Sequence, residues 1–221
     1  MKEIIISYLL SYVIIIASCF VYVELGMGDN DQFFNYPVFY VMIIFYIVVI
    51  IFLYKKNKRK ELRLNYRKYF PLFYFGISIA VILNLIIIRV TNNTIDNNYP
   101  LLLYFISSGI VGPIYEEILF RYILFNRLRD NYSDSKALFI SLIVFSLIHL
   151  SPIKIIYAFI IGFFITVIYR REKTILAPIL VHIGANSIVI LIYEFRVSIL
   201  ILAIINLVIS SYLVFRQTKI S

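Results

Sequence analysis

Two adjacent carboxylates and an arginine lie inside a very apolar stretch of the chain. Residues 114–121 read IYEEILFR, so Glu116, Glu117 and Arg121 interrupt a run of hydrophobic side chains. Glu117 and Arg121 are four residues apart and share one face of a helix, which allows them to form an ion pair. Glu116 is turned by about 100° from its neighbour. The spacing therefore predicts a structural Glu117–Arg121 pair and leaves Glu116 free for chemistry.

The two histidines of the chain lie in later apolar runs. His149 follows Phe145 by four residues, and Asn186 follows His182 by four residues, so each pair shares a helix face. A carboxylate and an imidazole can hold and deprotonate a water. A second imidazole and a carboxamide can donate hydrogen bonds to a developing oxyanion. Together these groups are the components of amide hydrolysis without a covalent nucleophile.

Each of these residues also has an interpretation that involves no chemistry. His149, or His182 with Asn186, could form hydrogen bonds between helices in a membrane. Glu116 is harder to explain in this way, because a buried carboxylate without an arginine must be protonated or find another partner. Glu116, His149 and His182 could instead ligate zinc, which accepts N and O donors and keeps a position open for water. The sequence lacks H-E-x-x-H, which excludes a zincin-type site.

The composition places these residues in a membrane protein. Of 221 residues, 62% are hydrophobic and 15% charged, whereas soluble domains average about 45–50% apolar and about 25% charged residues. Most of the apolar runs are close to the ~20 residues that cross a ~30 Å hydrocarbon core as a helix. We expect an all-α, polytopic transmembrane bundle of about eight spanning helices, formed by residues 4–25, 36–54, 70–89, 100–126, 137–151, 153–169, 174–193 and 197–215.

The basic residues lie between these runs and predict an orientation. Segment 55–68 holds eight of them, so by the excess of Lys and Arg in cytoplasmic loops it is expected to be cytoplasmic. Alternation then places both termini and segments 127–136 and 170–173 on the same side, which carries 17 of the 21 Lys and Arg residues. The net charge of +9 is therefore a signal of topology and argues against nucleic acid as a partner.

Counting residues from the predicted cytoplasmic ends estimates the depth of each polar group. At ~1.5 Å per residue, Glu116, His149, His182 and Asn186 lie roughly 12–20 Å from these ends. Four polar groups from three helices therefore fall in one layer near the middle of the membrane, where ionisable residues are costly and usually functional. We predict that they form one site.

The chain shows no internal repeat and no long linker, so we expect one integral membrane domain over residues 1–221. Residues 100–190 are expected to hold the catalytic core, while the role of helices in 1–99 is not evident from the sequence. The single cysteine excludes an internal disulfide framework. It ends the sequence IASC, which resembles a lipobox that would lipidate Cys19. Because apolar residues continue beyond it, we expect a retained first helix.

Three short motifs in the C-terminal half resemble those of a known family. In order, EEILFR (116–121), FSLIH (145–149) and HIGAN (182–186) are similar to the E-E-x-x-x-R, F-x-x-x-H and H-x-x-x-N signatures of the CPBP family of intramembrane proteases. This family includes the CAAX prenyl endopeptidases and the bacterial Abi proteins, some of which are linked to bacteriocin self-immunity. The resemblance covers residues ~100–190 of the sequence and includes every motif position.

The resemblance implies a role for each motif residue. Glu116 would be the general base and would work with His149 on the attacking water, while His182 and Asn186 would form the oxyanion hole. Three further residues would shape the site: Glu117, Arg121 and Phe145. The family is described both as metalloproteases and as metal-free glutamate proteases. The second description requires no cofactor, and Zn²⁺ is the alternative.

These observations predict an intramembrane endopeptidase in a bacterial plasma membrane. Its substrate would be a membrane-associated peptide or protein, such as a bacteriocin or signalling precursor, and the lipid bilayer would be its other partner. A non-catalytic bacteriocin immunity or scaffold protein with the same fold is a second possibility. A proton-coupled transporter that uses Glu116 and the histidines as a relay is a third, although the sequence lacks the inverted repeats common among transporters.

Overall fold

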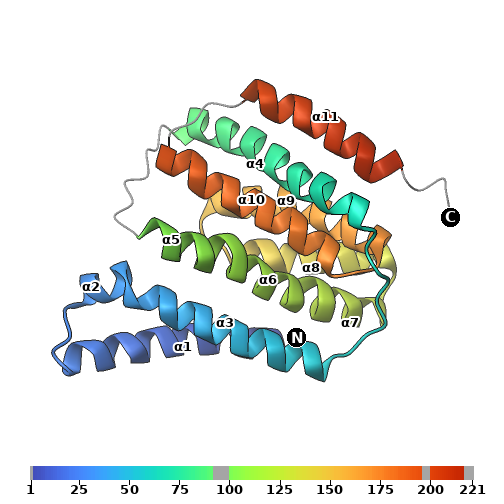
Figure 1. Cartoon of the computed structure of the whole chain (residues 1–221). Coiled ribbons are helices and arrows are strands. Elements are labelled where there is room, and N and C mark those ends of the chain that lie inside the picture. The colour runs from blue at the N-terminus through green and yellow to red at the C-terminus, as the bar shows by residue number, and fades with distance from the viewer. Residues whose placement is uncertain (1, 92–99, 196–199, 217–221) are drawn as a thin grey trace.

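The computed structural model describes residues 2–91, 100–195 and 200–216, and these residues form helices joined by turns and short loops (Figure 1). Each of the eight apolar runs forms a helix or a composite helix. The all-α membrane bundle predicted from the sequence is therefore confirmed. The long elements are α1 (Lys2–Glu24), α3 (Pro37–Lys56), α4 (Tyr69–Thr91), a composite helix (Leu101–Arg129), α8 (Asp134–Leu147), α9 (Pro152–Glu172), α10 (Leu176–Phe195) and α11 (Leu200–Arg216).

Length and apolar character allow several of these helices to cross a membrane. Within the described residues, four stretches are long and apolar enough: Pro37–Lys56, Tyr66–Ile86, Leu101–Arg129 and Pro152–Glu172. Shorter apolar stretches occur in α1, α10 and α11. Helix α8 has 14 residues, which at 1.5 Å per residue gives about 21 Å, less than the ~30 Å hydrocarbon core. The molecule is polytopic. That all eight apolar segments cross the membrane stays a prediction.

Most of the helices lie in one row. From top to bottom in Figure 1 the order is α11, α4, α10, the composite helix, α3 and α1, with α8 and α9 packed behind α10 and the composite helix. The short helix α2 (Asn30–Asn35) lies between α1 and α3 in the chain. The composite helix is therefore in the middle of the row, with α10 on one side and α3 on the other. This placement brings the first and third motifs together.

Basic segments that the sequence assigned to one side of the membrane meet at one end of the bundle. The backbone N–H of Leu62 donates to the carbonyl of Lys173 (3.1 Å). Asp130 pairs with Arg59 at 3.1 Å, and Arg170 pairs with Asp134 at 3.2 Å. Segments 55–68, 127–136 and 170–173 are therefore neighbours, as the predicted topology requires.

Two glycines allow α4 and α10 to pack with their backbones in contact. A Cβ atom on Gly76 would overlap the carbonyl group of Val181, and one on Gly184 would overlap the carbonyl oxygen of Phe73. Small residues permit such close approach between membrane helices. Because Gly184 lies between His182 and Asn186, this packing sets the position of the third motif.

Helix α1 contains Cys19 within an unbroken helical segment. The thiol is buried and donates to the side-chain oxygen of Asn30 in α2 at 3.4 Å. This contact joins α1 to the start of α2, the short helix that precedes α3.

Candidate active site

The acidic pair lies in a helix whose backbone changes its hydrogen-bond register. The composite helix contains α5 (Leu101–Tyr104), a π-helical segment η2 (Phe105–Val111), α6 (Gly112–Glu117), a second π-helical segment η3 (Ile118–Phe125) and α7 (Asn126–Arg129). A π-helical turn contains i→i+5 hydrogen bonds and often occurs at functional sites. Both glutamates stand at the end of α6, between the two π-helical segments.

Pro113 explains the first change of register. A proline has no N–H, so it cannot bond to the carbonyl four residues earlier, that of Gly109, or to the one five residues earlier, that of Ser108. The N–H of Gly112 donates instead to Ser107, five residues before it. Any residue other than proline at position 113 could donate its backbone N–H to the carbonyl of Ser108 or Gly109, and with Pro113 this donor is missing.

Side chains of α10 bind these two carbonyls. The amide Nδ2 of Asn186 donates to Ser108 O at 3.1 Å, and Ser187 Oγ donates to Gly109 O at 3.4 Å. The composite helix is therefore bonded to α10 at the point where Pro113 interrupts its backbone hydrogen bonds. Asn186 is half-buried, and one of its two amide N–H groups is used in this contact.

Glu117 joins an arginine of its own helix to a histidine of α10. Arg121 Nη1 donates to Glu117 Oε1 at 2.9 Å, so the ion pair expected from the i, i+4 spacing is present. His182 Nδ1 lies 2.7 Å from the same carboxylate oxygen. Glu117 and Arg121 are fully buried and His182 is 3% exposed. The contact between Glu117 and His182 was not anticipated from the sequence.

Arg121 has partners for its charge on α8 and α9 as well. Its Nε donates to Thr166 Oγ1 at 3.3 Å, and its Nη2 donates to the carbonyl of Gly162 at 3.1 Å. The guanidinium lies over the ring of Phe145, 4.2 Å from the centroid. A buried charge is tolerated when it is paired and hydrogen-bonded in this way. Neither Thr166 nor the carbonyl of Gly162 belongs to a motif, so sequence reasoning missed both.

Phe145 contacts both histidines. Its ring meets that of His149 edge-on, with centroids 5.2 Å apart, and that of His182 in the same manner at 6.0 Å. Gly162 makes room for this ring, since a Cβ there would lie 2.8 Å from Phe145 Cδ1. Phe145 therefore connects the second motif to the first and third.

Glu116 is the more accessible of the two glutamates. Its side chain is 23% exposed, and its Oε2 lies 3.7 Å from Nε2 of His182. The two nitrogens of the His182 ring therefore face two different carboxylates, Glu117 at hydrogen-bond distance and Glu116 slightly beyond it. On the side of α3, Tyr46 stacks on Tyr115, the residue before Glu116, with centroids 4.3 Å apart.

His149 lies in the turn between α8 and α9, two residues past the end of α8 at Leu147. Its Nδ1 lies 3.0 Å from the carbonyl oxygen of Phe145. Because a carbonyl oxygen can only accept, Nδ1 carries the hydrogen, and the neutral ring has its lone pair on Nε2. Among the described interactions, Glu116 contacts His182 rather than His149. Cooperation between Glu116 and His149 therefore stays a prediction.

The alternative zinc ligands do not gather as a metal centre. Among the described residues, no three His, Cys, Asp or Glu side chains are close enough together to hold a metal ion. Glu116, His149 and His182 thus do not fit the three-ligand arrangement of a catalytic zinc in this conformation.

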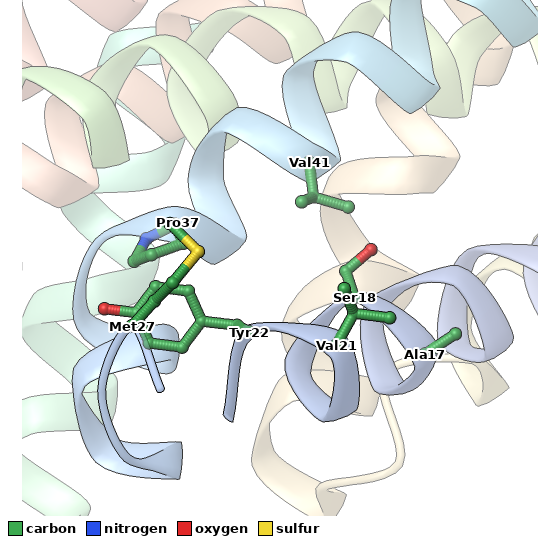
Figure 2. A pocket seen from close by; sticks show the side chains of 7 residues that line it. All are labelled: Ala17, Ser18, Val21, Tyr22, Met27, Pro37 and Val41. Carbon is green, nitrogen blue, oxygen red and sulfur yellow. The ribbon is translucent and has the colours of Figure 1, made fainter. Parts of the chain in front are cut away.

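A hollow of about 400 Å³ lies away from these residues, between α1 and α3 (Figure 2). Its wall is mainly apolar and includes no motif residue. The residues that line it are Ala17, Ser18, Val21, Tyr22, Met27, Pro37 and Val41. This hollow is therefore separate from the candidate site, which is defined by its polar contacts.

The apolar helices define an integral membrane helix bundle, with a buried Glu–Arg–His cluster between its helices. Residues 98–188 match the family model described as "Type II CAAX prenyl endopeptidase Rce1-like". That segment contains all three motifs. The match confirms the resemblance to this family that the motifs predicted, and it extends over residues 98–188 of the chain.

A curated protein is similar to this chain over a comparable length. The chain is 36% identical over 89 residues to the Bacillus subtilis (strain 168) protein named "Putative membrane peptidase YdiL". The alignment covers 40% of this chain and 36% of the relative, so the chain spans about a third of the relative it matches. No solved structure shows a significant match.

Proposed function

We propose that the protein is an intramembrane endopeptidase of the cell membrane that hydrolyses a peptide bond in a membrane-associated peptide or protein. The observation that carries this proposal is the position of His182, with Nδ1 2.7 Å from Glu117 and Nε2 3.7 Å from Glu116. One carboxylate is buried and paired, while the other is accessible. This difference is what a water-activating base beside a fixed histidine requires.

In this proposal Glu117 is a positioning residue. Arg121 holds it in place, so it accepts the Nδ1 hydrogen of His182 and fixes the orientation of the ring. The Nε2 atom of that ring is then directed toward Glu116. When His182 is protonated, the two carboxylates and the two cations of the cluster balance, which reduces the penalty for charges in an apolar surrounding.

Glu116 is the proposed general base. Its carboxylate would take a proton from a bound water as the water attacks the substrate carbonyl. His149 could accept or return a proton through Nε2, because its Nδ1 is occupied by the carbonyl of Phe145. The proton would finally go to the leaving amine, which completes the hydrolysis.

The proposed oxyanion donors lie on α10. Nε2–H of protonated His182 and the second amide N–H of Asn186 are available, since the other donors of these side chains bond to Glu117 and Ser108. Such donors stabilise the charge that develops on the carbonyl oxygen in the transition state. The chain's own residues supply base, acid and oxyanion donors in this scheme, and no step requires a metal.

The experiment compares membrane peptides from cells that express the wild type, Glu116→Gln or Glu24→Gln. Glu24 is an exposed carboxylate at the end of α1 and serves as the matched control. We expect peptides that disappear in Glu116→Gln and persist in Glu24→Gln. Identical peptide sets from all three strains, at equal protein abundance, would contradict proteolysis.

Other outcomes separate the remaining classes. A non-catalytic immunity or scaffold protein would keep its cellular phenotype in Glu116→Gln. A proton-coupled transporter would show flux driven by a pH gradient in proteoliposomes without peptide cleavage. For the metal question, purified protein that cleaves a substrate should retain its activity after a chelator such as 1,10-phenanthroline, and a loss restored by Zn²⁺ would assign a metal mechanism.

A further inference from the structure

A strongly basic segment crosses the end of the bundle where α3 is connected to α4. We call residues 55–68 the basic strap. It begins at the last turn of α3 and ends in a short 3₁₀ turn, Tyr66–Lys68. It carries eight Lys and Arg residues and one acidic residue, Glu61.

Hydrogen bonds hold the strap against the helices that carry the candidate site. The backbone N–H of Arg59 donates to the hydroxyl of Tyr122, next to Arg121, at 2.7 Å. The carboxylate of Glu61 accepts from the backbone N–H of Ile175 at 3.0 Å, just before α10 begins. The strap therefore has a defined conformation and does not merely link two helices.

These contacts remove negative charge from the outer surface of the strap. Glu61, its one acidic residue, is directed inward to Ile175. Lys68 is also directed inward and pairs with Glu172 at 2.7 Å, where both side chains are largely buried. Arg59 pairs with Asp130. Acidic side chains outside the strap therefore neutralise Arg59 and Lys68.

The other cations of the strap face outward. The exposed ones are Lys55, Lys56, Lys58, Lys60, Arg63 and Arg67. Within the described part of the chain, no acidic side chain forms an ion pair with Lys58, Lys60 or Arg63. A fixed group of exposed cations such as Lys58, Lys60 and Arg63 attracts anions.

Exposed apolar side chains alternate with these cations. Leu62 is 55% exposed, Tyr66 70% and Phe70, just after the strap, 75%. Aromatic residues of this kind gather at the boundary between hydrocarbon and water. Such residues would place the neighbouring cations at the level of the lipid headgroups.

We propose that the basic strap is a docking surface for the headgroups of anionic phospholipids. Clusters of four to eight Lys and Arg residues next to a spanning helix attract anionic lipids by charge. The alternation of cations with exposed apolar side chains favours a lipid over a water-soluble acidic peptide, because a lipid offers both a phosphate and a hydrocarbon chain. This property does not depend on whether the protein is a protease.

Because the chain contains no tryptophan, Tyr66→Trp introduces a single donor for energy transfer within the strap. The protein with this substitution is reconstituted into phosphatidylcholine vesicles, which need no scaffold protein, with a trace of dansyl-labelled phosphatidylglycerol or dansyl-labelled phosphatidylcholine. We expect at least threefold stronger transfer to the anionic lipid at low salt. The excess should disappear in 1 M NaCl, where charges are screened beyond about 3 Å.

A charge-matched pair of variants tests the location. In the Tyr66→Trp background, Lys60→Gln with Arg63→Gln should reduce the excess transfer by at least half. The control, Lys136→Gln with Arg216→Gln, loses the same charge from outside the strap and should keep the excess.

Equal transfer to both lipids, or equal loss in both double variants, would overturn the proposal. Binding of a fluorescent deca-glutamate peptide to the protein in phosphatidylcholine vesicles, without any preference for phosphatidylglycerol, would also overturn it and would indicate an acidic protein partner.

Discussion

One carboxylate oxygen, Oε1 of Glu117, lies 2.9 Å from Arg121 Nη1 and 2.7 Å from His182 Nδ1. Through this atom the first and third motifs are joined inside the bundle. The other oxygen, Oε2, is buried and has no hydrogen-bond partner within the described residues. Glu117 thus holds an arginine and a histidine through a single atom, while Glu116 stays accessible beside it.

The first prediction concerns the different roles of the two glutamates. Glu117→Ala should lower the free energy of unfolding by about 3–5 kcal/mol, because it leaves Arg121 buried without its carboxylate. Glu116→Gln should abolish cleavage with little change in stability, because that side chain is partly exposed. Thermal unfolding in detergent and a cleavage assay check both.

A double variant separates stability from activity at the same position. Glu117→Leu with Arg121→Met replaces a buried ion pair by apolar side chains of similar size, which is often neutral for stability. We expect stability near that of the wild type and no activity, since His182 loses its partner. An active double variant would show that Glu117 does not position His182.

The second prediction concerns Thr166, a residue outside the motifs. Thr166→Val keeps the shape but removes the acceptor for Arg121 Nε and the donor to Gly162 O. We expect a loss of roughly 1–3 kcal/mol in unfolding free energy, the range for hydrogen bonds to charged groups. The kcat of cleavage should fall more than the KM changes, and Thr166→Ser should restore both. Failure of Thr166→Ser to restore activity would assign Thr166 a packing role alone.

The third prediction concerns the packing of α10 on α4. Gly184→Ala places a Cβ against the carbonyl oxygen of Phe73, so the helices must separate and His182 must shift. We expect destabilisation by about 1–3 kcal/mol, typical of overpacking, together with loss of cleavage. Gly109→Ala is the matched control, since a Cβ there would meet ordinary contacts at 3.4 Å. Equal effects of the two substitutions would contradict the close-approach argument.

The fourth prediction concerns pH and the strap. Burial raises the pKa of Glu61 above its usual 4.5, although the hydrogen bond from Ile175 acts in the opposite direction. Because the folded protein holds this proton more tightly than the unfolded chain, the contribution to stability is present below pH 4.5 and is lost as the pH rises through the folded pKa.

Glu61→Gln should remove this dependence, because the amide oxygen can still accept from Ile175 without a charge. Compared with the wild type, the variant should gain stability as the pH rises from 4.5 toward 7. Unfolding midpoints measured across this range check the trend. A variant that becomes relatively less stable with rising pH would show that the ionised carboxylate is the favoured form.

Much of the architecture follows from local sequence. The apolar runs, their lengths and the basic segments between them predicted the helices and which loops share an end of the bundle. The i, i+4 spacing predicted the contact of Glu117 with Arg121, because the geometry of a single helix determines which residues share a face. The order of the motifs indicated the family that residues 98–188 resemble.

Contacts between distant parts of the chain were decided by the tertiary structure. Glu117 and His182 are 65 residues apart, and spacing within each helix cannot tell how two helices are rotated toward one another. That rotation depends on packing, as at Gly184, where the backbones of α4 and α10 touch. Pro113 was visible in the sequence as a potential kink. Only the fold showed that the carbonyl of Ser108 bonds to Asn186, because a freed carbonyl takes whichever donor the neighbouring helix brings within reach.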